Sequence, residues 1–198
     1  MTDARYAMRD VRKGDMEIRT DRLILREFAA EDWRAVYAYH NDTRYLEFYE
    51  WEHRTEQDTK AFVQMFMDQQ AETPRTKFQF AVVLQENNKL IGNAGIRKRS
   101  VKTYQADMGY EIDPRVWGNG YATEAADAIV KFGFEQLRLH RITAQAIAEN
   151  QNSIRVLEKL GMRQEGRLRE NEYFKGRFWD TVIYGILEEE WRWKRAQV

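Results

Sequence analysis

The stretch from Asp113 to Ala125 reads DPRVWGNGYATEA, and the rest of the chain is arranged around it. A strand pattern precedes this stretch and a helix pattern follows it. Gly118 and Gly120 can adopt positive φ without a Cβ penalty, so consecutive backbone N–H groups can face one concavity. A helix from Ala122 would add unpaired first-turn amides and the positive end of its dipole. The stretch therefore predicts a site for an anion such as a diphosphate, although many such turns only turn the chain.

The composition indicates one globular domain. The chain has 198 residues, of which 43% are hydrophobic, so it can bury one sizeable core but is too short for two ordinary domains. We expect residues 1–15 to form a loose N-terminal arm and residues 16–198 to form the domain. Basic and acidic residues number 32 each, which removes the positive charge expected of a general nucleic-acid binder.

Several classes of site are excluded by residues that the sequence lacks. It contains no cysteine, which excludes disulfides, thiolate metal sites and a cysteine nucleophile. Its three histidines, His40, His53 and His140, have no ligand spacing, so we expect no metal. No apolar run approaches membrane-spanning length and the first residues have no secretory h-region. We therefore expect a cytoplasmic protein with no membrane partner.

Predicted strands and helices lie on both sides of the glycine turn. Those before it are a strand over 17–27 with a turn near Asp21, helices over 29–40 and 55–71, a hairpin with strands over 78–85 and 89–99, and a strand over 105–112. Those after it are a helix from 122, a strand over 141–149, a short helix ended by Gly161, a strand over 178–187 and a polar helical tail. The helix over 55–71 opens with Thr55 and Asp58, a variant of the capping box.

The strand over 105–112 leads directly into the glycine turn. Its apolar residues alternate with a second set that would line the opposite face, namely Gln105, Asp107, Gly109 and Glu111. This alternation predicts two carboxylates on one face of the strand, close to the anion site.

In this order of elements, two segments resemble the GNAT superfamily of N-acetyltransferases. They are WGNGYATEA, which contains the glycine turn, and ENQNSIRVLEKLGM, which begins at Glu149. More narrowly, TDRLILREF, GYEIDPRVWGNGYATEA, NSIRVLEKLGM and GRFWDTVIYGIL are similar to the branch of ribosomal-protein (alanine/serine) N-terminal acetyltransferases. The resemblance spans Thr20 to Leu187. It implies an α/β (α+β) fold, with a mixed, mostly antiparallel central sheet flanked by helices and splayed between its fourth and fifth strands.

The resemblance also implies a co-substrate, acetyl coenzyme A. Its diphosphate would lie on the backbone amides of Trp117, Gly118, Asn119, Gly120, Tyr121, Ala122 and Thr123. Its pantetheine arm would pair like an extra strand with the backbone around Glu111 and Ile112, in the gap where the strand splays from Ala144 to Ala148. Asn150 would hold the pantetheine amides.

Catalysis requires a neutral amine, a route for its proton and a group that assists departure of the thiolate. Many superfamily members use a tyrosine as the acid, but Leu157 stands at that position. The resemblance implies Ser153 as its substitute. From residue type alone, Ser153 could equally be a first-turn serine and Asn150 a helix N-cap. Asp107 and Glu111 are the candidate bases, and each would act through water or through a pKa raised by its environment.

The segment from Tyr45 to His53 is a candidate acceptor site. Four aromatic residues, including Trp51, are interspersed there with three glutamates, including Glu50. Aromatic faces and carboxylates attract ammonium groups, so we expect Glu50 and Trp51 to bind the acceptor. The alternative is that the aromatics fill the core beneath a loop while the glutamates stay solvated.

Together these features predict an N-acetyltransferase that moves acetyl from acetyl coenzyme A to a primary amine by direct attack in a ternary complex. The acceptor would be a protein N-terminus or a small amine, and a homodimer is compatible with the resemblance. The alternative is a non-catalytic regulatory module that binds coenzyme A. A Rossmann-type binder fits less well, because Thr123 stands at the third glycine position and the turn comes late in the chain. A phosphate-loop NTPase would need GKS or GKT, which is absent.

Overall fold

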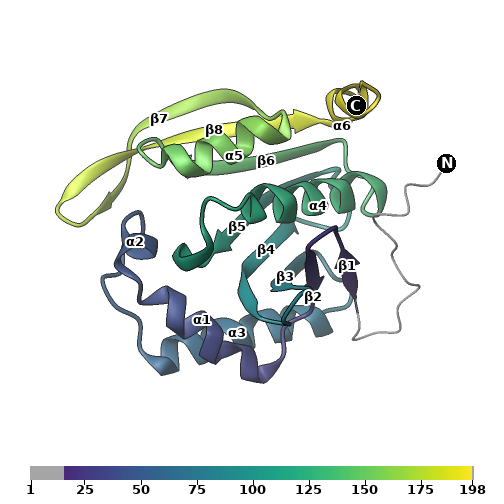
Figure 1. Ribbon diagram of the computed structural model, residues 1–198. Helices are drawn as coiled ribbons and strands as arrows, with labels where there is room; N and C mark the ends of the chain where they lie inside the picture. Colours follow the sequence, from purple (N-terminus) through teal and green to yellow (C-terminus); the bar gives the residue numbers. More distant parts are fainter. Residues whose placement is uncertain (1–15, 198) are drawn as a thin grey trace.

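The computed structural model describes residues 16–197, so the predicted N-terminal arm lies outside the described residues. Its centre is a sheet in the order β1-β2-β3-β4-β5-β6-β8-β7 (Figure 1). The strands are β1 (Glu17–Arg19), β2 (Leu23–Arg26), β3 (Lys77–Leu84), β4 (Leu90–Lys98), β5 (Gln105–Ile112), β6 (Arg141–Ile147), β7 (Arg163–Phe174) and β8 (Arg177–Leu187). All neighbours are antiparallel except β5 and β6, which are parallel.

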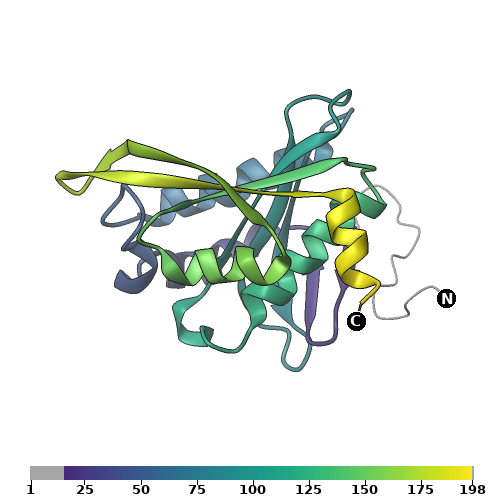
Figure 2. The ribbon, with the colours of Figure 1, turned by 90° about the horizontal axis from the view of Figure 1, so that it is seen from above.

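Helices cover both faces of the sheet (Figures 1 and 2). They are α1 (Trp33–His40), α2 (Thr43–Leu46), α3 (Glu56–Ala71), α4 (Tyr121–Glu135), α5 (Gln151–Leu160) and α6 (Glu188–Arg195), with 3-10 turns at Ala30–Asp32 and Pro114–Val116. Alternate side chains of β3 point to opposite faces of the sheet, so the core is divided into two clusters. Val82 packs in the cluster that contains the buried faces of α4 and α5, whereas Ala81 and Val83 pack with those of α1 and α3.

Two local signals in the sequence are confirmed by their geometry. Thr55 and Asp58 form a reciprocal capping box at the start of α3, in which the Thr55 hydroxyl accepts from the Asp58 N–H at 3.1 Å. Gly161 ends α5 in the left-handed conformation, with φ of +87°. In both cases the decisive contacts lie within a few residues of sequence, which is why the sequence could predict them.

The turn predicted near Asp21 is confirmed, because the Thr20 N–H donates to the Leu23 carbonyl and turns the chain between β1 and β2. Other predicted elements differ in detail. The helix predicted from residue 29 begins as a 3-10 turn, and α2 was not predicted. Strand β7 was also missed, since most of its residues are exposed and polar, and its strand conformation depends on pairing with β8.

The gap predicted between the two parallel strands is present between β5 and β6. They pair only from Gln105 with Arg141 to Asp107 with Thr143, although both strands continue beyond those residues. From Met108 onward, β5 therefore has no strand partner on that side. Unpaired backbone groups at such an edge need other hydrogen-bond partners. The gap opens beside the glycine turn, since β5 ends at Ile112.

Candidate active site

The glycine turn joins β5 to α4 as predicted. Gly118 and Gly120 both have left-handed backbones, with φ of +83° and +81°. A Cβ at Gly118 would meet no atom within 4 Å, so that side of the turn is open. Within residues 16–197, no side chain caps α4, which begins at Tyr121. Its first-turn amides, including those of Ala122 and Thr123, lack a side-chain acceptor and fit a bound anion.

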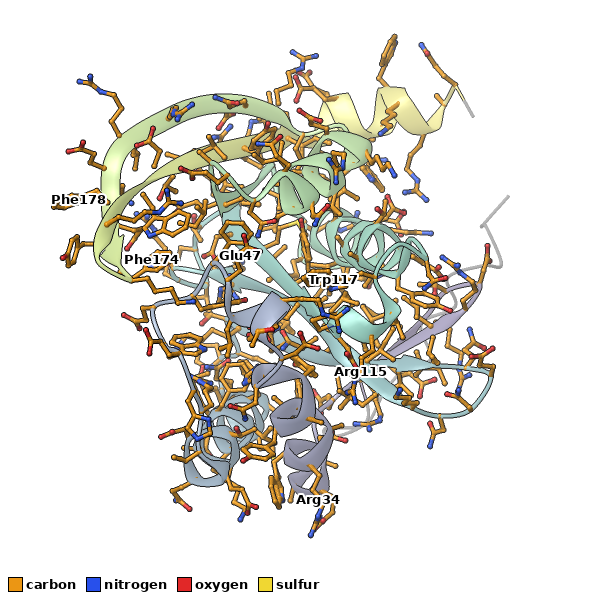
Figure 3. All side chains as sticks on the ribbon, turned by 60° about the vertical axis from the view of Figure 1, so that its left-hand side comes forward. Arg34, Glu47, Arg115, Trp117, Phe174 and Phe178 are labelled. Atoms are coloured by element: carbon orange, nitrogen blue, oxygen red, sulfur yellow. The ribbon has the colours of Figure 1, made fainter. Side chains whose placement is uncertain are left out.

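Two side chains hold the shape of this turn. The Asn119 side-chain amide donates to the carbonyls of Val116 at 3.0 Å and Trp117 at 3.3 Å. The Trp117 indole donates to the Ile112 carbonyl at 2.6 Å. Trp117 itself lies on the surface beside the turn (Figure 3). Ile112 as a whole is buried.

Arg22 places a guanidinium beside the glycine turn, where it is paired with a carboxylate, and the sequence analysis missed this feature. Its guanidinium donates to the Asn119 carbonyl at 2.9 Å and pairs with Glu124 at 2.7 Å. It also lies 4.6 Å from the centre of the Tyr121 ring. Glu124 in turn accepts from the Thr20 hydroxyl at 2.6 Å. These contacts tie the β1–β2 turn to the start of α4, although the two are far apart in the sequence.

At the gap between β5 and β6, the start of α5 meets β5. Asn150 is the N-cap of α5, and its side-chain oxygen accepts from the Ser153 N–H at 3.1 Å. The Ser153 hydroxyl lies 3.0 Å from the Tyr110 hydroxyl, which also donates to the Ser153 carbonyl. Burial raises the pKa of Tyr110 to about 12, despite the opposing effect of the Ser153 hydrogen bond. Tyr110 is therefore a phenol at neutral pH and can donate a proton.

Glu111 points to the other face of the sheet, where α1 covers it. One carboxylate oxygen accepts from Asn93 at 2.7 Å and lies 3.2 Å from the His40 Nε2 and 3.4 Å from the Tyr39 hydroxyl. The other accepts from the Tyr49 hydroxyl at 3.4 Å. The His40 side chain is fully buried, whereas the Glu111 side chain is 16% exposed and lines the cleft described below. Glu111 is thus held by several donors and still reaches the cleft.

These donors determine the ionisation of Glu111. Burial alone would raise the pKa of Glu111, but the hydrogen bond and charge of His40, with the hydrogen bond from Asn93, lower it below its usual 4.5. Burial and the nearby Glu111 charge raise the pKa of Tyr39 and of Tyr49, so both remain donors. Of the two options given for the candidate bases, a pKa raised by the environment is therefore wrong for Glu111. Its carboxylate is ionised at neutral pH.

The two carboxylates of β5 share a face but not an environment. Asp107 pairs with Arg97 on the neighbouring strand at 2.6 Å, and its side chain is 50% exposed. It lies where β5 still pairs with β6, whereas Glu111 lies beside the open part of the gap. This arrangement favours Glu111 over Asp107 as the group nearest to an acyl donor in the gap.

A cleft of about 1330 Å³ runs over the Glu111 face of the sheet and through the gap between β5 and β6 to the start of α5. It is lined by Glu50, Trp51, Asp107, Glu111, Asn150 and Ser153, so it brings together the candidate catalytic and acceptor residues and one coenzyme-binding candidate, whereas Ile112 and residues 117–123 do not line it. The β7–β8 hairpin reaches the α2 segment at one end, where Trp179 lies 5.9 Å from Phe48. Phe174 stacks on Trp179 beneath the hairpin, and Phe178 projects outward at its tip (Figure 3).

Within the candidate acceptor segment, Glu50 and Trp51 differ. Glu50 is exposed in the cleft. Trp51 is half-buried, with its ring 4.9 Å from that of Tyr49 and 4.2 Å from the Arg54 guanidinium. A cation of the protein itself thus already contacts Trp51. The geometry favours Glu50 for contact with an acceptor and gives Trp51 a share in packing.

Four residues of this site were not selected from the sequence as site residues: Arg22, His40, Asn93 and Tyr110. Consecutive side chains of β5 point to opposite faces of the sheet, so Tyr110 lies on the face opposite Glu111. This pattern could have indicated that a tyrosine faces the start of α5. No local pattern could have found His40 or Asn93. His40 is 71 positions from Glu111 in the sequence and Asn93 is 18 positions from it, and only folding brings them into contact.

Comparisons with known proteins agree on one class, acetyltransferases. The acetyltransferase (GNAT) domain family matches residues 22–163. An uncharacterised N-acetyltransferase of Bacillus subtilis, YnaD, is 40% identical over 177 residues, which cover 89% of this chain and 99% of YnaD. The crystal structure of a GNAT-family acetyltransferase from Bacillus anthracis is 35% identical with a TM-score of 0.77, covering 88% of this chain and 99% of that one.

The chain therefore belongs to the GNAT family of acetyltransferases and is an acyltransferase. A more distant structure shares the fold, namely spermidine N-acetyltransferase from Vibrio cholerae in complex with CoA and spermine. It is 21% identical with a TM-score of 0.74, and the match covers 86% of this chain and 98% of that one. Among the described residues, no helix is both long and apolar enough to cross a membrane.

Proposed function

We propose that this protein transfers the acetyl group of acetyl coenzyme A to a primary amine by direct attack in a ternary complex. One observation carries the proposal. The gap between β5 and β6 has the uncapped glycine turn beside it and Glu111 at its rim, so a donor held by the turn and an amine at Glu111 would meet at one opening. Family membership supports the same reaction class.

On the donor side, the backbone amides from Trp117 to Thr123 would hold the diphosphate, with the Arg22 guanidinium adding charge. The pantetheine arm would run along the unpaired edge of β5 near Ile112. Asn150 uses its side-chain oxygen to cap α5, so its NH₂ group remains available to a pantetheine carbonyl. When bound, acetyl coenzyme A supplies an activated thioester, and these groups of the chain would position it.

On the acceptor side, the ionised Glu111 would attract the amine as an ammonium. The proton that leaves the nitrogen before attack would pass through water at Glu111 to solvent, since a carboxylate with a lowered pKa is too weak a base to keep it. The second nitrogen proton would follow the same path as the tetrahedral intermediate collapses. As the carbon–sulfur bond breaks, the thiolate would take its proton from the Tyr110 and Ser153 hydroxyl pair. Asp107, paired with Arg97, would remain outside the proton path.

Binding of the donor is tested by thermal unfolding. Acetyl coenzyme A at a hundred times its Kd should stabilise the folded protein by about 2.7 kcal/mol, and NAD or ATP should not. Gly120→Val should abolish the increase in Tm. The valine side chain would enter the turn, and a valine backbone does not easily adopt the left-handed conformation of Gly120. Protection by NAD or ATP alone would contradict the proposal.

Catalysis is tested separately, by release of the coenzyme thiol with a panel of amines that includes peptides, spermidine and aminoglycosides. An amine-dependent release supports the enzyme. If acetyl coenzyme A raises the Tm but no amine leads to release of the coenzyme thiol, the result would favour the alternative, a non-catalytic module that binds coenzyme A.

A further inference from the structure

The charges that line the cleft are separated along its length. At the end where β5 and β6 splay, the lining carboxylates are Glu50, Glu111 and Glu172, and none of the lining residues there is basic. The opposite end is lined by the basic residues Lys77, Arg97, Arg99 and Arg141, with the single carboxylate Asp107. One end of the cleft is therefore suited to a cation and the other to an anion.

The basic end keeps positive charge that the protein does not neutralise. Arg97 pairs with Asp107 and Arg141 pairs with Glu165. Lys77 and Arg99 form no ion pair with any residue in the described range 16–197. Both lie at the cleft wall, Lys77 half-buried and Arg99 exposed. A surface that holds uncompensated cations in a concave site attracts an anionic group.

The spacing of the two ends can be read from the strands. Asp107 and Glu111 lie on the same face of β5, four residues apart, which corresponds to about 13 Å at roughly 3.3 Å per residue. Lys77 pairs in register with Arg97, and Arg97 pairs with Asp107. Along β5 the basic end therefore begins about 13 Å from Glu111. Lys77 lies two strands across from β5, so its Cα is about 16 Å from that of Glu111, and Arg99 lies farther along the strand direction. An extended peptide of about five residues spans this distance together with its own acidic side chain and the long side chains of Lys77 and Arg99.

Resting on the proposed function, we propose that the acceptor is the N-terminus of a polypeptide with an acidic side chain at its fourth or fifth residue. The terminal ammonium would lie at Glu111 and the acidic side chain at Lys77 and Arg99. A cleft that continues from Glu111 to these basic residues suits an extended segment better than a small amine. A polyamine would bring a second cation to the basic end, so spermidine should be a poor acceptor.

The proposal is tested with C-terminally amidated pentapeptides Ala-Ser-Ala-X-X, in which X is Glu, Gln or Lys. With saturating acetyl coenzyme A, kcat/KM should decrease in the order Glu, Gln, Lys, by at least tenfold overall and less steeply at high salt. The double variant Lys77→Glu and Arg99→Glu should abolish or reverse this order. The matched control is Lys102→Glu, which changes an exposed lysine of the β4–β5 loop that does not line the cleft.

A second readout keeps this inference separate from the proposed reaction. Dissociation constants of the same peptides are measured by calorimetry on the protein with coenzyme A, where no acetyl transfer occurs. The same order of affinity supports the inference even if no peptide is acetylated. Equal affinity for the Glu and Lys peptides, or a preference for spermidine, overturns it. If acetyl coenzyme A is turned over with all amines alike, only the inference fails.

Discussion

Glu111 owes its ionised form to neighbours that come from separate parts of the chain. His40 is the last residue of α1, Asn93 lies on β4 and Tyr49 follows α2. Each donates to the carboxylate, and together they lower the pKa of Glu111 although burial alone would raise it. A buried carboxylate with this many donors is well suited to hold a cationic acceptor.

We predict that Glu111→Gln reduces kcat/KM for the acceptor about a hundredfold to ten-thousandfold, with the Kd of acetyl coenzyme A unchanged. Because the pKa of Glu111 is lowered in the folded state, its ionised form contributes stability above pH 4.5. That contribution is lost as the pH falls through the lowered value. The stability difference between wild type and Glu111→Gln should therefore shrink in acid. Steady-state kinetics and denaturant unfolding between pH 3 and 7 measure both effects, and an unchanged kcat/KM would remove Glu111 from the mechanism.

Ser153 can be tested without disturbing the helix that carries it. The cap of α5 uses the backbone N–H of Ser153, so Ser153→Ala removes only the hydroxyl that contacts Tyr110. If the pair protonates the thiolate, Ser153→Ala and Tyr110→Phe should each lower kcat by about a hundredfold or more, with little change in coenzyme affinity. Single-turnover kinetics are the appropriate measurement. A normal rate in both variants, with chemistry rate-limiting, would reduce Ser153 to a first-turn serine.

At the scale of elements, the segment from Tyr45 to His53 combines packing with exposure. Its rings continue a stack that begins at the buried His40 and passes through Tyr45 and Tyr49 to Trp51, with centroids 4.6 to 4.9 Å apart. The glutamates between these aromatics point to solvent or into the cleft. We therefore expect the packing account to apply to Trp51 and the acceptor account to apply to Glu50.

This division leads to opposite expectations for neighbouring positions. Trp51→Ala removes a half-buried ring from the stack and should lower the free energy of unfolding by about 3 kcal/mol. Glu50→Gln should leave Tm unchanged and raise the acceptor KM severalfold, because it removes one carboxylate from the cation-binding end of the cleft. Thermal unfolding and acceptor titration separate the two. A stable Trp51→Ala protein with a raised acceptor KM would instead make Trp51 part of the acceptor site.

At the scale of the whole molecule, the sheet separates the proposed donor and acceptor regions and joins them at one gap. Consecutive residues of β5 point to opposite faces, so Tyr110 meets Ser153 beside the α4–α5 layer while Glu111 meets His40 beside the α1–α3 layer. The splay of β5 from β6 is the place where both faces are accessible together. Donor and acceptor can thus approach from different sides, as direct transfer in a ternary complex requires.

The sequence by itself determined those features that depend on contacts within a few residues. The left-handed glycines before α4, the capping box at Thr55, the C-terminal glycine of α5 and the alternation of β5 all follow from local backbone preference. The predicted helices α3 and α5 and the β3–β4 hairpin were correct for the same reason. The family could also be named, because several such segments occur in a specific order.

Only the tertiary structure decided which side chains meet. Strand β7 exists through its pairing with β8, and Arg22 reaches the glycine turn across 97 positions of sequence. The ionisation of Glu111 and the separation of charge along the cleft depend on residues that converge from different elements. Burial and electrostatic interaction depend on distance in space, and residues far apart in the sequence acquire such distances only when the chain has packed.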